Sequence, residues 1–195
     1  MFWNKIINKF KVKVRKSYYD SGALWCVAPY KNGKMHGIVK YYRESGALHT
    51  VTPYKNGKVH GIGKGYYRSG ALSWESPCVN GQRHGILKSY CESGALMTET
   101  PHVNGKEHGI EKWYYESGSV CCVTPYENGK IHGIRKEYYE SGSLNKEIPY
   151  EDGKRHGEVK IYDESGALKE EALYDDGEYM GVIYAKTKSQ NNKIW

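Results

Sequence analysis

Six histidines recur at a constant spacing of 24 residues, and a regular row of imidazoles could serve as metal ligands or as general acids and bases. They are His36, His60, His84, His108, His132 and His156. With two strands per repeat at a spacing of about 4.8 Å, equivalent positions stand roughly 9.6 Å apart. A metal needs ligand atoms about 2 Å from one centre. We therefore expect no metal here, and a structural histidine that bonds a backbone group beside a turn.

A row of lysines has the same period and suggests two other kinds of chemistry. It consists of Lys40, Lys64, Lys88, Lys112, Lys136 and Lys160. A partly matching acidic row consists of Glu44, Glu92, Glu116, Glu140 and Glu164. The lysines could grip phosphates of lipid or nucleic acid. The alternative, which we favour, is a ladder of solvated cross-strand ion pairs that keeps a sheet soluble.

Nucleophilic catalysis would need a cysteine or serine with a histidine and an acid. Cys91 stands where other copies have a second tyrosine, Cys121 and Cys122 fall in an expected strand, and no histidine outside the repeat accompanies them. The glycines are isolated turn residues and form no phosphate-binding loop. We therefore predict that the chain is not an enzyme and needs no cofactor.

The elements that position these residues follow from the glycines. All but Gly63 and Gly65 fall into three series of period 24, which give seven copies over residues 17–184. Each copy contains an Asn-Gly or Asp-Gly pair and a Ser-Gly pair, and both are turn signals. The runs between them are rich in Tyr, Ile, Val and Thr, which favour strands. The pattern predicts an antiparallel meander of about fifteen strands.

The repeated sequence, as in HGIRKEYYESGSL followed by PYEDGK at 132–154, resembles the MORN repeat in its bacterial variant form. That form is typical of YwqK-type antitoxins. The resemblance covers all seven copies and implies an elongated, curved single sheet of hairpins. It also implies a binding scaffold, because repeats of this kind serve varied partners.

The fold class expected is all-β: an elongated single antiparallel meander sheet of seven 24-residue MORN-like hairpins with a short N-terminal cap helix. Residues 1–16 would form a cap of an amphipathic helix and an opening strand, residues 17–184 the repeats, and residues 185–195 a tail. Phe2, Trp3, Ile6, Ile7 and Phe10 fit one helical face over residues 1–10. That helix could cover the sheet edge or anchor the chain to a membrane.

Charge is unevenly distributed. Residues 17–88 carry 10 basic and 3 acidic side chains, whereas residues 89–184 carry 10 basic and 19 acidic ones. A nucleic-acid binder would be more uniformly basic, so we expect no nucleic-acid partner. Five cysteines without a paired pattern argue for a reducing compartment, and a secretory segment is not apparent. We therefore expect a cytoplasmic protein.

Positions that vary from copy to copy are where partner choice can be encoded. With two-residue turns, the predicted register places two of them on the face that carries the lysines. One series is Trp25, His49, Ser73, Met97, Cys121, Asn145 and Lys169, and the other contains Glu75, Glu99, Glu147 and Glu171. Leu48, Thr52, Tyr54 and Tyr67 would lie on the opposite face, with Gly61 allowing a close approach. A bulge would exchange the faces.

These features predict a non-enzymatic protein-binding scaffold, namely an antitoxin or immunity protein that sequesters a toxin. A basic toxin would suit the acidic half, with Glu75, Glu99, Glu147 and Glu171 as the expected contacts. The alternative is a membrane-associated scaffold that binds anionic lipid through residues 1–16. A monomer or an end-to-end dimer through terminal strands is expected.

Overall fold

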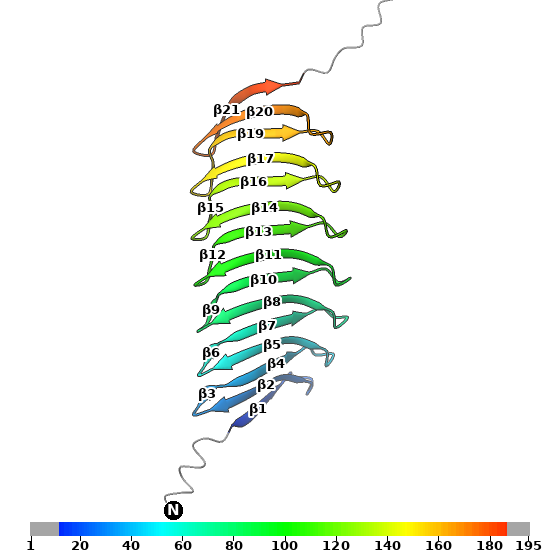
Figure 1. Ribbon diagram of the computed structural model, residues 1–195. Coiled ribbons are helices and arrows are strands. Elements are labelled where there is room, and N and C mark those ends of the chain that lie inside the picture. The colour runs from blue at the N-terminus through cyan, green and yellow to red at the C-terminus, as the bar shows by residue number, and fades with distance from the viewer. Residues whose placement is uncertain (1–11, 187–195) are drawn as a thin grey trace, which may run out of the picture. The chain divides into compact units, whose positions relative to one another are not determined.

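The computed structural model describes residues 12–186, and these form an all-β protein without helices (Figure 1). Its 21 strands are arranged as a hairpin meander in one open antiparallel sheet, as the repeat pattern predicts. The chain divides into two compact units, residues 1–107 and 108–195. The expected cap helix over residues 1–10 lies outside the described residues.

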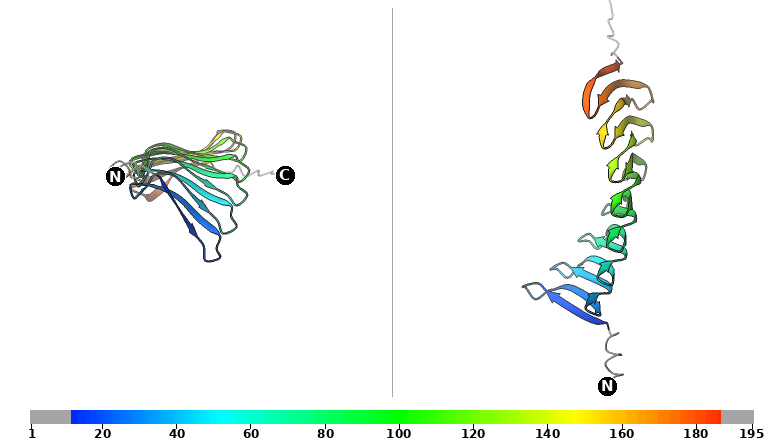
Figure 2. Two further views of the ribbon diagram at one scale, coloured as in Figure 1. Left: turned by 90° about the horizontal axis from the view of Figure 1, so that it is seen from below. Right: turned by 90° about the vertical axis from the view of Figure 1, so that its left-hand side faces the viewer.

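The first unit contains twelve strands, β1 to β12. They are β1 Lys13–Tyr18, β2 Leu24–Lys31, β3 Lys34–Met35, β4 Gly37–Tyr42, β5 Leu48–Lys55, β6 Lys58–Val59, β7 Gly61–Tyr66, β8 Leu72–Val79, β9 Gln82–Arg83, β10 Gly85–Tyr90, β11 Leu96–Val103 and β12 Lys106–Glu107. Within this unit successive hairpins are rotated against one another, as the left view of Figure 2 shows for the blue and cyan strands. This is the usual twist of an antiparallel sheet.

The second unit contains the other nine strands. They are β13 Gly109–Tyr114, β14 Val120–Glu127, β15 Lys130–Ile131, β16 Gly133–Tyr138, β17 Leu144–Glu151, β18 Lys154–Arg155, β19 Gly157–Tyr162, β20 Leu168–Asp175 and β21 Glu178–Ala185. In each unit the Asn-Gly or Asp-Gly turns lie at one edge and the Ser-Gly loops at the other (Figure 1).

The Asn-Gly turns are two-residue hairpins, as predicted. Lys31 pairs with Lys34, so only Asn32 and Gly33 stand between β2 and β3. Their φ angles are 52° and 74°, and every equivalent Asn or Asp also has a positive φ. Two successive positive φ angles define the type I′ turn, which matches the twist of the strands that it joins.

After every one of these turns except the last, the strand is broken at the histidine, which is why there are more strands than the fifteen expected. Pro29 has no backbone N–H, so it cannot donate a hydrogen bond to the neighbouring strand. Its carbonyl accepts the N–H of His36 over 2.9 Å. Gly37 follows with a φ of 111°. In the next copy a Cβ on Gly61 would stand 2.9 Å from Cγ of Pro53, so the predicted close approach at Gly61 is confirmed.

The Ser-Gly loops are longer than the two residues assumed from the sequence. In the first loop the N–H of Tyr19 donates to the Ala23 carbonyl and the N–H of Gly22 to the Tyr19 carbonyl. The register then shifts, because Tyr18 pairs with Leu24 but Ser17 pairs with Cys26. Trp25 is therefore the extra residue of a β-bulge. Hairpins in both units repeat the shift.

The bulge corrects part of the predicted face assignment. We call the face with the periodic lysines the lysine face, and the face with Cys26, Ala28 and Val39 the core face. Leu48 pairs with Tyr42 and so lies on the lysine face, not opposite it. The series that begins with Trp25 and His49 occupies bulged positions, and the Trp25 ring lies 5.8 Å from the Tyr41 ring of the core face. Thr52 and Tyr54 lie on the core face, as predicted.

Most of the buried side chains are small and lie on the core face, and His102, 3% exposed, is one of the larger ones. Val39 is fully buried and Thr124 is 2% exposed. In the first unit, Tyr30, Met35, Tyr41 and Tyr54 pack against the buried cluster of Cys26, Ala28 and Val39. Partly exposed rings thus cover small residues and take the place of a second layer.

Candidate functional site

The four glutamates expected to contact a partner all lie on the lysine face, each paired with a periodic lysine. Each carboxylate lies within 3.3 Å of the ammonium group of the lysine opposite it across the hairpin. The pairs are Lys64–Glu75 at 2.7 Å, Lys88–Glu99 at 3.1 Å, Lys136–Glu147 at 3.0 Å and Lys160–Glu171 at 3.3 Å.

These contacts confirm the cross-strand ion pairs but correct their partners. The acidic row that begins with Glu44 falls in or next to the Ser-Gly loops, whereas the strand glutamates face the lysines. The hydrogen bond and charge of Lys136 lower the pKa of Glu147, and the Tyr162 hydroxyl donates to the same carboxylate over 3.1 Å. The hydrogen bond to Glu75 likewise raises the pKa of Lys64. Any partner of these glutamates meets a neutral pair, not a bare carboxylate.

A row of half-exposed isoleucines runs beside the ion pairs. Ile38, Ile62 and Ile86 of the first unit are 54%, 53% and 47% exposed, and Ile110 and Ile134 of the second are 50% and 49% exposed. In the first unit each isoleucine is paired with a proline of the next strand, for example Ile38 with Pro53. In each unit the lysine face therefore presents exposed isoleucines that bury little surface within the fold, and ion pairs lie beside Ile62, Ile86 and Ile134.

Two histidines of the row, His36 and His60, have the expected structural role beside a turn. Nδ1 of His36 accepts the backbone N–H of Asn56 over 3.4 Å, and His60 does the same for Asn80. Next to this bond, the Gly57 N–H donates to the Met35 carbonyl over 2.8 Å. Each Asn-Gly turn of these copies is thus fastened to the preceding copy by one side chain and one backbone group. Within residues 12–186 we find no group of three His, Cys, Asp or Glu residues placed to hold a metal.

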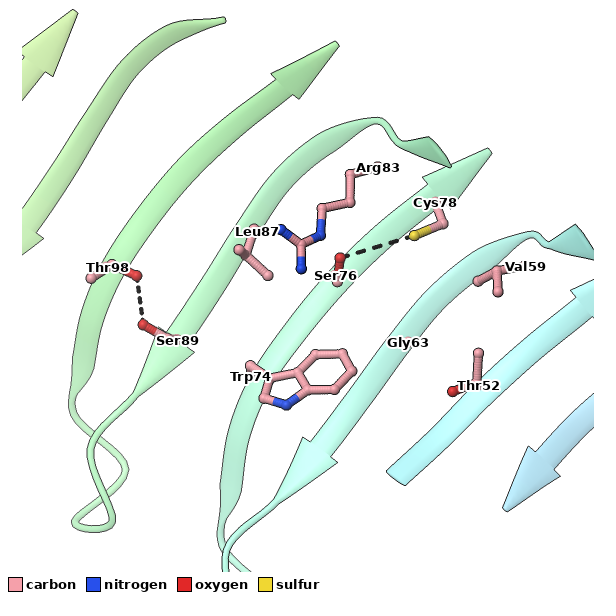
Figure 3. A pocket seen from close by; sticks show the side chains of 10 residues that line it. All are labelled: Thr52, Val59, Gly63, Trp74, Ser76, Cys78, Arg83, Leu87, Ser89 and Thr98. Carbon is pink, nitrogen blue, oxygen red and sulfur yellow. Dashed lines mark hydrogen bonds between the residues drawn. The ribbon is translucent and has the colours of Figure 1, made fainter. Parts of the chain in front are cut away.

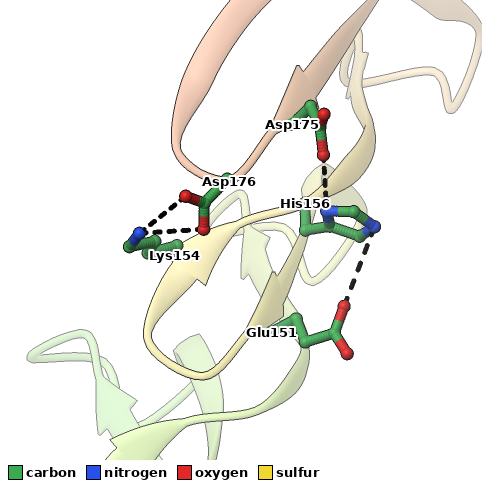
Figure 4. Close-up of polar contacts among 5 residues, drawn as sticks. All are labelled: Glu151, Lys154, His156, Asp175 and Asp176. Atoms are coloured by element: carbon green, nitrogen blue, oxygen red, sulfur yellow. Dashed lines mark hydrogen bonds and ion pairs between the residues drawn. The ribbon is translucent and has the colours of Figure 1, made fainter.

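Near the end of the second unit, His156 contacts carboxylates, while the Gly177 N–H still donates to the Arg155 carbonyl. Nδ1 of His156 lies 3.1 Å from Asp175 and its Nε2 lies 3.7 Å from Glu151 (Figure 4). Lys154 contacts both carboxylate oxygens of Asp176 at 2.8 Å. These groups are at least half exposed.

The opposite edge contains hydrogen bonds that sequence reasoning missed. The hydroxyl of the second tyrosine in a copy donates to the backbone carbonyl of the first tyrosine in the next copy. Tyr19 reaches Tyr42 over 2.8 Å, Tyr67 reaches Tyr90 over 2.6 Å, Tyr115 reaches Tyr138 over 2.7 Å and Tyr139 reaches Tyr162 over 2.9 Å. The preference for tyrosine over phenylalanine in the sequence was the available signal, since only tyrosine supplies this donor.

The cysteines contact hydroxyl groups. Sγ of Cys122 lies 3.5 Å from Oγ1 of Thr124, and Sγ of Cys78 lies 4.0 Å from Oγ of Ser76. Burial raises the pKa of the Cys122 thiol, which keeps it protonated and poorly nucleophilic. All five cysteines are free thiols.

One groove opens on the core face of the first unit, with a volume of about 460 Å³ (Figure 3). Its walls include Trp74, Ser76, Cys78, Arg83 and Leu87. Its floor includes Gly63, one of the two glycines outside the 24-residue series. Sequence reasoning noted these glycines as exceptions but assigned no site to them.

Comparison with known families identifies the kind of protein that this geometry builds, a hairpin repeat scaffold. The pattern of the MORN repeat variant matches residues 11–32, 35–56, 107–128, 131–152 and 155–176. These segments cover more than half of the chain, so the chain belongs to the MORN repeat variant family, whose repeats are scaffolds for binding. The unmatched stretch between residues 56 and 107 contains the whole lining of the groove except Thr52.

Other comparisons add little about function. No curated protein matches the chain. Among the 36 solved chains that match is a crystal structure of a mutant of S. aureus TarM in complex with Fondaparinux, alpha-GlcNAc-glycerol and UDP. It is 11% identical with a TM-score of 0.31, and the match covers 80% of this chain but 23% of that one. Separately, the described residues contain no helix that is long and apolar enough to span a membrane.

Proposed function

We propose that this protein is a non-enzymatic scaffold that binds a protein partner, in the role of an antitoxin or immunity protein that covers the active surface of a toxin. The half-exposed isoleucine row of the lysine face carries the scaffold part of this proposal. Residues such as Ile62 and Ile86 recur in nearly every copy yet bury little within the fold. Exposed apolar rows with a polar border are typical of protein-binding surfaces.

The ion pairs form the border of this proposed interface. Lys64 and Glu75 lie two residues along their strands from Ile62 and Pro77 on the same face. A partner that desolvates such a pair gains orientation and register more than raw affinity. Glu75, Glu99, Glu147 and Glu171 therefore remain proposed contacts, each as half of a pair.

The antitoxin role rests on the resemblance to YwqK-type proteins and on the charge distribution. Residues 89–184 carry nine more acidic than basic side chains, which suits a basic partner. A toxin that acts on nucleic acid has a basic surface of this kind. The proposed cytoplasmic location is consistent with free cysteines.

The test is capture of partners from the native host, with the intact chain and two variants as bait. In the interface variant Ile62→Ser, Ile86→Ser, Ile110→Ser and Ile134→Ser interrupt the apolar row in both units. In the control variant Glu44→Gln and Glu92→Gln alter two exposed loop residues. We expect one basic protein that is bound by the intact chain and the control but lost from the interface variant.

The captured protein is then expressed alone and together with the chain in a neutral host. Growth arrest that the chain relieves would support the antitoxin role, and a captured protein without toxicity would contradict it. Vesicles that contain anionic lipid test the membrane alternative. Co-sedimentation that disappears when residues 1–10 are deleted would favour that alternative.

A further inference from the structure

The groove of the first unit exists because four positions depart from the repeat. Gly63 stands where other copies have Val39, Leu87 or bulkier residues, and Gly65 stands where Tyr41 is found. Cys78 occupies the position of Tyr54. Trp74 is the largest residue of its own series. The groove therefore has no tyrosine ring at position 78, and the large indole of Trp74 lies beside this space.

The indole of Trp74 does not fill the space left by the missing ring. A Cβ at Gly65 would collide with Nε1 of Trp74, so the indole lies directly on that glycine. A Cβ at Gly63 would meet the far end of the indole at 3.5 Å, an ordinary contact. Neither glycine has a positive φ. Their role is therefore to make room above the sheet and not to permit an unusual backbone.

Arg83 supplies a single charge at the groove. It is exposed, and it is the only lining residue with a permanent charge. Figure 3 shows its guanidinium group turned across the sheet face toward Leu87 and Ser76. The structure shows no acidic partner for it among residues 12–186. A planar guanidinium beside an apolar wall is suited to a carboxylate that adjoins a ring.

We propose that the groove binds an aromatic side chain of a protein partner, with a carboxylate of the same partner held by Arg83. The partner's ring takes the place of the tyrosine ring that Cys78 cannot provide, between the Trp74 indole and Leu87. Trp and Arg are the residues that most often dominate binding energy at such anchors. This inference rests on the proposed protein-binding function and names the chemistry of one contact.

The test uses N-acetyl-phenylalanine, which has a ring and a carboxylate, and its uncharged amide as probes. Binding is followed through the indole N–H signal of Trp74 in NMR spectra, assigned with Trp74→Phe. We expect the Trp74 signal to shift with the acid, and about tenfold weaker binding of the amide, because a charge-assisted hydrogen bond is lost. Arg83→Gln should reduce acid binding to the level of the amide.

Matched variants decide whether the groove is responsible. Gly63→Val introduces the residue found at Val39, and Cys78→Tyr restores the repeat tyrosine. Both should abolish the Trp74 shift while circular dichroism stays unchanged. Arg155→Gln, at the equivalent position of the second unit, should leave binding as in the intact chain. Should both filling variants fail to fold, the comparison of Arg83→Gln with Arg155→Gln still decides.

Equal binding of acid and amide, or an unchanged Trp74 shift in folded Cys78→Tyr, would overturn the proposal. Capture from the native host separates this failure from that of the proposed function. A protein bound equally by the intact chain and by Cys78→Tyr would leave the scaffold function standing and refute the groove. If no protein is captured, the proposed function is refuted, and so is the proposal that a protein partner supplies the aromatic ring.

Discussion

Arg83 in the first unit and Arg155 in the second occupy the same position of the repeat but have different surroundings. The guanidinium of Arg155 lies 5.2 Å from the centre of the Tyr174 ring, and a hydrogen bond to Tyr150 raises its pKa. At the positions of these tyrosines the first unit has His102 and Cys78. The same backbone therefore holds one arginine against rings and leaves the other open. The two sites therefore differ in their side chains at fixed repeat positions and not in the repeat pattern of strands and turns.

The edges of the two units differ in the same way. His36 accepts a backbone N–H in the first unit, whereas His156 contacts Asp175 and Glu151 in the second. The glycine N–H bond to the preceding copy is retained in both, at 2.8 Å for Gly57 and 2.9 Å for Gly177. Backbone contacts thus define the repeat, and side-chain contacts at the edge can change from uncharged to charged.

The largest expected effect concerns the glycine beside proline. Gly61→Ala should destabilise the fold by about 2–3 kcal/mol, because it combines a strained φ of 118° with a contact of 2.9 Å to Pro53. Gly133→Ala, where the contact to Pro125 is 3.3 Å, should cost less. Gly46→Ala, strained but in open space, should cost about 1 kcal/mol. Denaturant unfolding measures all three, and equal losses would mean that the proline contact is irrelevant.

The next effect tests the bulge in both units through thiol reactivity. Cys26 and Cys122 hold equivalent core-face positions, are 7% and 5% exposed, and have pKa values raised by burial. They should react with iodoacetamide at least about tenfold more slowly than Cys91 and Cys121, because the buried thiols need local opening. Mass spectrometry of the labelled peptides gives the rates. Faster labelling of Cys122 than of Cys121 would reverse the assigned faces.

A smaller effect concerns the tyrosine hydroxyls that join consecutive copies. Tyr67→Phe and Tyr139→Phe should each lower the free energy of unfolding by about 1 kcal/mol, since each leaves a carbonyl without its donor. Tyr54→Phe is the control on the core face. Thermal unfolding is sufficient to compare them. If the control loses as much as the other two, packing and not the hydroxyl explains the tyrosines.

The smallest effect concerns Glu147 and its dependence on pH. Its pKa is lower in the folded state, so its stabilising contribution is present above the unfolded pKa near 4.5 and is lost as pH falls toward the folded value. Glu147→Gln should cost under about 1 kcal/mol at pH 7, as for other partly exposed pairs. The difference from the intact chain should become smaller when the pH is lowered from 7 to a value below 4.5. Denaturant titrations at both pH values, with Glu164→Gln as control, check the sign.

Much of the fold could be predicted because its signals are local. The Asn32-Gly33 pair specifies a two-residue turn through the φ angles that these residues tolerate, and Gly61 could be recognised as a close approach. The constant period excluded a shared metal for the histidines before their bonds to the turn of the next copy were known. Each of these conclusions depends on residues near one another in the chain.

The tertiary structure decided what depends on register and on stacking between copies. One extra residue at His49 reverses the face of Leu48, and the sequence has no separate signal for such a bulge. Strand pairing places Glu75 opposite Lys64, which the sequence alone did not indicate. The acceptor of the Tyr67 hydroxyl, the Tyr90 carbonyl, lies 23 residues further along the chain. The repeat itself could be recognised in the sequence because the residues that specify each turn are adjacent in the chain. The ion pairs and the groove at Trp74 could not be predicted from the sequence, because they arise only when separate strands are brought within a few ångströms of one another.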